Sequence, residues 1–115
     1  MNLDGVCMSV SATDRQGVVS AETVLRFVQR GPHVLARYGG GSVRRGYLVG
    51  RLFGSTLTFR YVQTEASGDV HGGHSVCDVT RGPEGRISLV EHFTWDTRDG
   101  SGTNVFEEIQ SWRQQ

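Results

Sequence analysis

The chain of 115 residues has only two prolines and two cysteines, and its twelve basic and twelve acidic residues leave no net charge. Nucleic acids and anionic membranes attract proteins with a basic excess, so the balance argues against both as partners. No run of about 18 apolar residues indicates a membrane span, and residues 1–20 show no charged-then-apolar leader. Because two isolated cysteines in such a chain are typical of a reduced protein, we expect a cytoplasmic location.

Glycine, by contrast, is abundant. There are 16 glycines, with 37% hydrophobic and 21% charged residues, and this composition is typical of a folded chain with many tight turns. The length suits a single domain over residues 1–115. We expect residues 1–20 to form a weakly structured first strand and loop, and residues 111–115 to form a polar tail.

Short alternating stretches separated by turn residues run through the sequence. They predict an all-β fold, an antiparallel up-and-down meander of about eight strands. Such a sheet can close into a small barrel of the calycin or lipocalin type, which removes exposed edges; a β-sandwich is the alternative. A helix from Ser20 competes with the second strand. The expected strands lie within residues 1–10, 23–30, 33–38, 43–52, 57–64, 70–81, 87–95 and 102–108.

The clearest pairing lies on either side of Gly54-Ser55, a plausible two-residue turn. This turn would place small residues opposite large ones, which allows rings to lie flat across a neighbouring strand. The predicted pairs are Leu52 with Leu57, Gly50 with Phe59, Leu48 with Tyr61, and Gly46 with Gln63.

The hairpin formed by residues 87–108 predicts an inward face that combines aromatic and carboxylate side chains. A two-residue turn at residues 99–100 or 100–101 would set Glu91 beside Glu108 or Gln110. Only one of Glu107 and Glu108 can share this face, and Glu108 is the better candidate, whereas a three-residue turn would bring Glu107 inward. The predicted face holds Leu89, Glu91, Phe93, Trp95, Asn104, Phe106 and Glu108.

The face assignment of residues 70–81 depends on the turns on either side. A two-residue turn near Ser67-Gly68 and a four-residue turn at residues 82–85 would turn His74, Val76 and Asp78 inward. A one-residue error in either turn would place His71, Ser75 and Cys77 inside instead. Gly72-Gly73 also suggests a bulge.

These faces define a candidate interior site. The first hypothesis is a protein that binds a small ligand in or at the mouth of the barrel. The second is an enzyme that uses Glu91, Glu108 and His74 as acids and bases, since neighbouring buried carboxyls have raised pKa values. The sequence favours a non-enzyme and assigns no catalytic residue. The candidate ligand-binding residues are Tyr61, Gln63, His74, Glu91, Trp95, Asn104 and Glu108.

A third hypothesis is a structural or interaction module with a filled core. In that case the glutamates would form a satisfied network with an interior arginine, such as Arg44, or with Tyr61 and His74. Interior volume separates the hypotheses, because an open cavity of roughly 300 Å³ or more with convergent polar groups favours a ligand.

Two further clusters in the sequence, one of histidine and cysteine and one of arginine, have other possible roles. His71, His74 and Cys77 resemble a metal cluster, but a regular strand turns them to opposite faces, so we predict no metal and no cofactor. An outer stripe of arginines is expected to be solvated surface, with RNA as a weaker alternative. We predict no nucleic-acid or membrane partner and consider a homodimer, which a net charge near zero does little to oppose. The stripe contains Arg26, Arg37, Arg44, Arg45, Arg51 and Arg60.

Several motifs resemble a family of small bacterial proteins that often carry the name N-acetylglutamate synthase. They span roughly residues 22–108, and the name would imply acetyl transfer to glutamate. Residues 37–42 lack the last small residue of the phosphate-cradling Gln/Arg-x-x-Gly-x-Gly/Ala turn of common acetyltransferases. The resemblance carries over no catalytic residue. It rests on Gly46-Tyr-Leu-Val-Gly50, Tyr61-Val-Gln63, His74-Ser-Val-Cys77, Glu91-His-Phe-Thr-Trp95 and Asn104-Val-Phe-Glu-Glu108.

Overall fold

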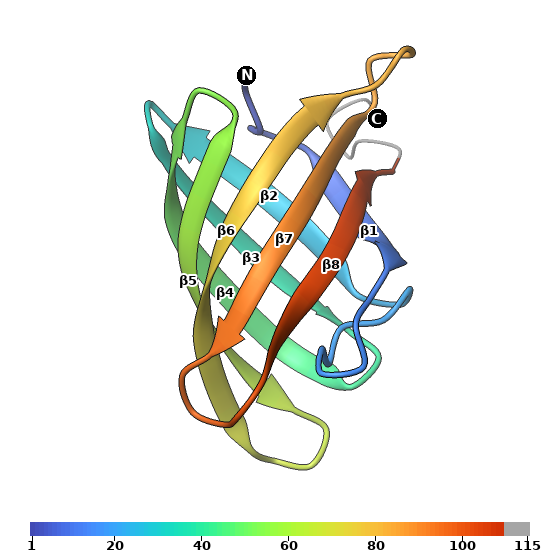
Figure 1. Cartoon of the computed structure of the whole chain (residues 1–115), viewed down its shortest axis with the longest axis vertical. Coiled ribbons are helices and arrows are strands. Elements are labelled where there is room, and N and C mark those ends of the chain that lie inside the picture. The colour runs from blue at the N-terminus through green and yellow to red at the C-terminus, as the bar shows by residue number, and fades with distance from the viewer. Residues whose placement is uncertain (110–115) are drawn as a thin grey trace.

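A computed structural model describes residues 1–109 as a closed barrel of eight antiparallel strands, each paired with the next and β8 with β1 (Figure 1). The predicted all-β meander is therefore confirmed, and the sheet closes into a barrel instead of forming a β-sandwich. The second element is a strand rather than a helix. The tail predicted at residues 111–115 lies outside the described residues. The strands are β1 Cys7–Ala12, β2 Val24–Arg30, β3 His33–Gly40, β4 Val43–Phe53, β5 Thr56–Glu65, β6 Val70–Arg81, β7 Ile87–Trp95 and β8 Ser101–Glu108.

Alternation of side chains along each strand fills the barrel. In β5 every second residue from Leu57 to Glu65 is buried, and the residues between them are exposed. This period of two is the direct consequence of the pleat. The described residues contain no helix long and apolar enough to span a membrane.

The predicted β4–β5 register is confirmed at all four pairs, from Leu52 with Leu57 to Gly46 with Gln63. Both glycines make room for a close neighbour. A Cβ atom at Gly46 would overlap the ring of Tyr38 on β3, and one at Gly50 would overlap the Thr58 carbonyl and the Cβ of Phe59 on β5. Glycine therefore lets the Tyr38 ring lie across β4 at position 46 and lets the β5 backbone approach closely at position 50.

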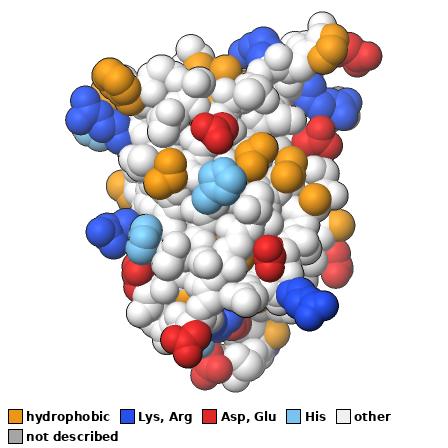
Figure 2. Space-filling model, viewed as in Figure 1, with side chains coloured by type: hydrophobic (Ala, Val, Ile, Leu, Met, Phe, Trp, Pro, Cys, Tyr) orange, Lys and Arg blue, Asp and Glu red, His pale blue; other side chains and the backbone are white. Residues whose placement is uncertain are grey.

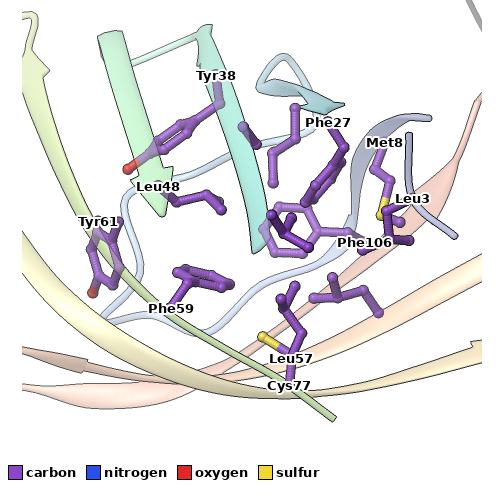
Figure 3. Close-up of a cluster of buried hydrophobic side chains, with 14 of the residues drawn as sticks. Leu3, Met8, Phe27, Tyr38, Leu48, Leu57, Phe59, Tyr61, Cys77 and Phe106 are labelled. Atoms are coloured by element: carbon purple, nitrogen blue, oxygen red, sulfur yellow. The ribbon is translucent and has the colours of Figure 1, made fainter. Parts of the chain in front are cut away.

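Apolar side chains fill the barrel at the end that carries the N-terminal segment, the upper end in Figure 1. Leu3 and Val6 precede β1 and are fully buried, and the Gly5 amide donates to the Phe27 carbonyl at 3.0 Å. Figure 3 shows Leu3 and Met8 on one side of the apolar cluster and Tyr38 and Tyr61 on the other. The tyrosines therefore mark the polar end of the interior.

The predicted faces of β6 are wrong, and the stated alternative is correct for Ser75 and Cys77, whereas His71 is only half-buried. Both adjoining turns have three residues, because Glu65 bonds to Asp69 across residues 66–68 and Gly82 bonds to Arg86 across residues 83–85. Ser75 and Cys77 consequently point inward, whereas His74, Val76 and Asp78 are exposed. The register runs without a shift on both sides of β6, so the expected bulge at Gly72-Gly73 is absent.

The β7–β8 connection is longer than predicted. Thr94 pairs with Ser101, so the pairing slides by an even number of residues and keeps the predicted faces. Glu91 therefore lies opposite Asn104 instead of Glu108 or Gln110. Glu108 shares the inward parity of Phe106, as predicted, but it lies at the apolar end, where it accepts a hydrogen bond of 3.1 Å from the Ile87 amide.

Candidate functional site

A small cavity lies at the end of the barrel opposite Leu3. Its volume is about 30 Å³, room for roughly two water molecules. This is far smaller than the roughly 300 Å³ typical of the smaller ligand pockets. The side chains around it are mainly aromatic and aliphatic, with a few polar groups. They come from Val18, Val19, Leu25, Tyr38, Leu48, Phe59, Tyr61, Gln63, Glu91, Phe93, Trp95, Asn104 and Phe106.

Glu91 is the buried carboxyl of this cavity. It projects from the middle of β7, and neighbouring strands supply two hydrogen-bond donors: Ser75 Oγ at 2.6 Å and Asn104 Nδ2 at 2.9 Å. Burial raises the pKa of Glu91, although the bonds from Asn104 and Ser75 act in the opposite direction. No ion pair to Glu91 is formed within residues 1–109. The carboxyl is thus satisfied by neutral donors and lacks a counter-ion.

A second polar chain runs from the interior to the mouth. The Tyr38 hydroxyl donates to Gln63 Oε1 at 2.8 Å, and Gln63 Nε2 donates to Glu65 Oε2 at 2.9 Å. Glu65 Oε1 accepts a charged hydrogen bond of 2.7 Å from Arg98 Nη2. The Arg98 guanidinium also lies 4.5 Å from the centre of the Trp95 ring. This series of hydrogen bonds orients Gln63 Oε1 toward Tyr38 and places the Arg98 guanidinium at one side of the cavity mouth.

Aromatic rings form the wall between these polar groups. Tyr61 and Trp95 meet edge to face with ring centres 5.4 Å apart, and Phe59 and Phe93 each lie 6.1 Å from one of them. The Tyr61 hydroxyl makes only a long bond of 3.5 Å, to the Thr94 carbonyl. Burial raises the pKa of both Tyr38 and Tyr61, so both hydroxyls stay protonated donors. Tyr61 therefore has hydrogen-bonding capacity to spare.

The long loop of residues 13–23, between β1 and β2, covers the mouth of the cavity and is called the cover loop below. Thr13 Oγ1 donates to Asn104 Oδ1 at 2.6 Å, and Trp95 Nε1 donates to the Gln16 carbonyl at 2.9 Å. Gln16 Oε1 also accepts from the Ser101 amide at 3.0 Å. Side chains of the site thus hold the loop shut, and Val18 and Val19 complete its apolar lining.

The structure brings five of the seven candidate residues to the cavity, although whether they bind a ligand stays a prediction. Those five are Tyr61, Gln63, Glu91, Trp95 and Asn104.

The prediction that His74 lies inside is wrong. Its Nδ1 lies 2.9 Å from Asp96 on the outer surface, because the three-residue turns reverse β6. Glu108 has the inward parity but is only half-buried, lies at the opposite end of the barrel and does not line the cavity. The arrangement of Glu91, Glu108 and His74 required for the acid–base hypothesis is therefore not assembled. The partners suggested for the glutamates under the filled-core hypothesis, an interior arginine or Tyr61 and His74, are not those of Glu91, which bonds to Ser75 and Asn104.

Sequence reasoning missed several parts of the site. Tyr38 follows the inward alternation of β3, and Ser75 belongs to the alternative face of β6, so both carried a signal. The contacts of the cover loop carried no such signal, because an irregular loop has no periodic pattern from which its position could be predicted. Glu65 continues the inward alternation of β5, but its ion pair with Arg98, 33 residues away, carried no sequence signal.

The histidine and cysteine motif does not assemble a metal centre. No group of three or more metal-ligating side chains gathers within residues 1–109. His71 Nδ1 lies 2.8 Å from Thr97 Oγ1, whereas Cys77 is fully buried beside Leu57 and Glu91. Burial raises the pKa of the Cys77 thiol, which makes it a poor nucleophile.

Comparison with known proteins supports the barrel fold. A family model described as avidin-like protein matches residues 1–109. The chain belongs to the avidin-like family. Neither the curated proteins nor the solved structures searched contain a match. An avidin-like barrel of eight strands has an interior just large enough for side chains or one small ligand. In this avidin-like chain, the cavity around Glu91 is the part of the interior that side chains leave unfilled.

Proposed function

We propose that this protein binds a small molecule inside the barrel, in the cavity around Glu91 and beneath the cover loop. The observation that carries the proposal is a buried carboxyl without a counter-ion in an aromatic cavity, closed by a loop that the cavity's own side chains hold in place. Membership of the avidin-like family supports a ligand in the barrel. Buried carboxyls are costly in a core whose only task is packing.

The polar groups favour a compact, flat ligand with at least one N–H or O–H donor. Each Glu91 oxygen receives one donor and keeps a free lone pair, and Tyr61 offers a hydroxyl with one weak partner. Rings of Phe59 and Trp95 would pack against the faces of such a ligand. Arg98 at the mouth would suit an anionic tail.

Binding requires the cover loop to move. A cavity of about 30 Å³ cannot hold a ring compound. Opening would break the bonds from Thr13 to Asn104 and from Trp95 to Gln16, and it would withdraw Val18 and Val19 from the cavity. Ligand contacts must replace these interactions, so association is expected to be slower than for an open site.

Two measurements test the proposal. Native mass spectrometry of the purified protein would detect a retained ligand as a defined added mass. Calorimetry would then test biotin, which streptavidin holds in a barrel of the same strand number, and N-acetylglutamate, which the sequence resemblance suggests. Glu91→Gln should weaken binding at least tenfold, because it replaces a carboxyl acceptor by an amide, whereas Glu107→Gln on the outer surface serves as the matched control. Equal affinities for both variants would place the ligand elsewhere.

A filled-core interaction module is the second candidate. It is favoured by the small cavity and by the finding that every buried side-chain nitrogen or oxygen in the described residues has a hydrogen-bond partner. A filled core predicts that amides of the cover loop exchange with solvent as slowly as those of β5. A binding protein predicts faster exchange in the loop, because it must open.

A further inference from the structure

The outer face of β2 to β5 is unusual in its charge. Within residues 24–65 the only acidic residue is Glu65, which points inward and pairs with Arg98, whereas seven arginines lie on the outer surface. The whole chain has no net charge, so this face is strongly polarised against the rest. The face over β5 to β8 in Figure 2, by comparison, mixes acidic, basic, histidine and hydrophobic side chains.

Of these seven arginines, only Arg60 has a carboxylate within ion-pair distance among residues 1–109, that of Asp96 at 3.7 Å. The other six have none there. An isolated surface arginine is normal, but six unpaired ones on three adjacent strands create a lasting positive potential. They are Arg26, Arg30, Arg37, Arg44, Arg45 and Arg51.

An exposed apolar row runs between the arginines. Strand pairing aligns Val28, Leu35 and Val49 across β2, β3 and β4, and their exposed fractions are 41%, 45% and 60%. The row borders a surface groove of about 700 Å³. Three neighbouring aliphatic side chains exposed to this extent are suited to contact with another molecule.

Arginine rows flank the apolar row on both sides. On one side the register aligns Arg26, Arg37 and Tyr47, with Arg44 and Arg45 beyond them around a second hollow of about 300 Å³. On the other side it aligns Arg30, His33 and Arg51. The surface therefore consists of a basic row, an apolar row and a second basic row. Neighbouring rows lie two residues, or about 6.7 Å, apart along each strand.

We propose that this face docks an amphipathic acidic helix of a partner protein, whose apolar stripe lies on Val28, Leu35 and Val49 and whose flanking carboxylates pair with the arginines. Neighbouring strands lie about 4.8 Å apart, which matches the advance of roughly 4.5–6 Å between helix residues i and i+3 or i+4. A helix about 10–12 Å wide reaches both arginine rows. Arginine pairs with carboxylates through two parallel hydrogen bonds, which adds orientation to attraction.

Other occupants fit this face less well. A second copy of the chain in a two-fold contact would set the six unpaired arginines against one another. Nucleic acid would use the arginines but not the aliphatic row, and the three rows hold only two rings on which a base could stack, Tyr47 and His33, in the two outer rows.

The test uses a labelled 15-residue peptide with leucine at helical positions i, i+4, i+7 and i+11, glutamate on both flanks and alanine elsewhere. Fluorescence anisotropy measures its affinity for the full chain, and amide chemical shifts locate it. The peptide should bind more tightly than a scrambled peptide of the same composition, with shifts on β2 to β4. Arg26→Gln with Arg37→Gln should weaken binding about 2- to 20-fold, since an exposed ion pair changes affinity by about 1.5- to 5-fold.

Matched variants separate the face from general charge. Leu35→Ser should also weaken binding, because it interrupts the apolar row. Arg15→Gln with Arg86→Gln, two exposed arginines outside the face, should leave the affinity unchanged, as should Glu91→Gln in the cavity. Equal binding of the scrambled peptide, or an equal loss in the Arg15 and Arg86 variant, would overturn the proposal. Tighter binding of a 15-nucleotide DNA or of phosphatidylserine vesicles, or a dimer abolished by Leu35→Asp, would overturn it in favour of that occupant.

Discussion

Asn104 joins the buried Glu91 carboxyl to the loop that covers the barrel. Its Nδ2 donates to Glu91 Oε1 at 2.9 Å, while its Oδ1 accepts from Thr13 at 2.6 Å. A single amide therefore responds to the charge of the carboxyl and to the position of the loop.

Glu91→Gln should change how stability depends on pH. Burial raises the pKa of Glu91 in the folded state, so the folded protein binds its proton more tightly than the unfolded chain. As pH rises above the ordinary glutamate pKa of about 4.3, the wild type should lose up to about 1.4 kcal/mol per pH unit until the folded pKa is passed. The glutamine variant lacks this loss. Urea unfolding at pH 4.5 and pH 8 measures the difference, and the wild-type slope persisting in the variant would assign it to another group.

Trp95→Phe should loosen the cover loop while keeping an aromatic ring in the wall. The substitution removes the indole N–H that donates to the Gln16 carbonyl at 2.9 Å. Hydrogen exchange of amides in residues 13–19 should become about 2- to 10-fold faster, consistent with the loss of one hydrogen bond of about 0.5–1.5 kcal/mol. Exchange in β5 should stay the same, and a uniform acceleration across the barrel would indicate general destabilisation instead.

Gly46→Ala should destabilise the barrel by about 1–3 kcal/mol, because the added methyl group would overlap the ring of Tyr38. Gly82→Ala is the matched control. A Cβ atom there meets nothing closer than the Arg86 carbonyl at 3.6 Å, and its backbone has no positive φ. Thermal unfolding of the two variants compares them directly, and equal losses would show that the glycine is needed for some reason other than space.

Both cysteines should resist alkylation in the folded protein. Cys7 and Cys77 are buried, and burial raises the pKa of the Cys77 thiol. Iodoacetamide at pH 8 should add no mass over the time in which a chain unfolded in guanidinium gains two adducts. Rapid modification of Cys77 in the native state would mean that the barrel wall between Leu57 and Glu91 opens readily.

The sequence by itself determined the strands, the barrel and most of the inward faces. Alternation of period two is a local property of each strand, so it identified the inward parity of Tyr61, Gln63, Glu91 and Asn104 without knowledge of any neighbour. The pairing around Gly54-Ser55 was also predictable, because a two-residue turn fixes the register by itself.

Only the tertiary structure decided which side chains meet. The faces of β6 depended on two turns whose lengths differ by one residue from those expected, and a one-residue slip exchanges His74 for Ser75 in the interior. The length of the β7–β8 loop set Asn104 rather than Glu108 against Glu91. The cover loop obeys no period, so its contacts with Asn104 and Trp95 arise only when distant strands close the barrel. Interior volume, and with it the choice between a filled core and a binding site, is likewise a property of the closed barrel and of no single strand.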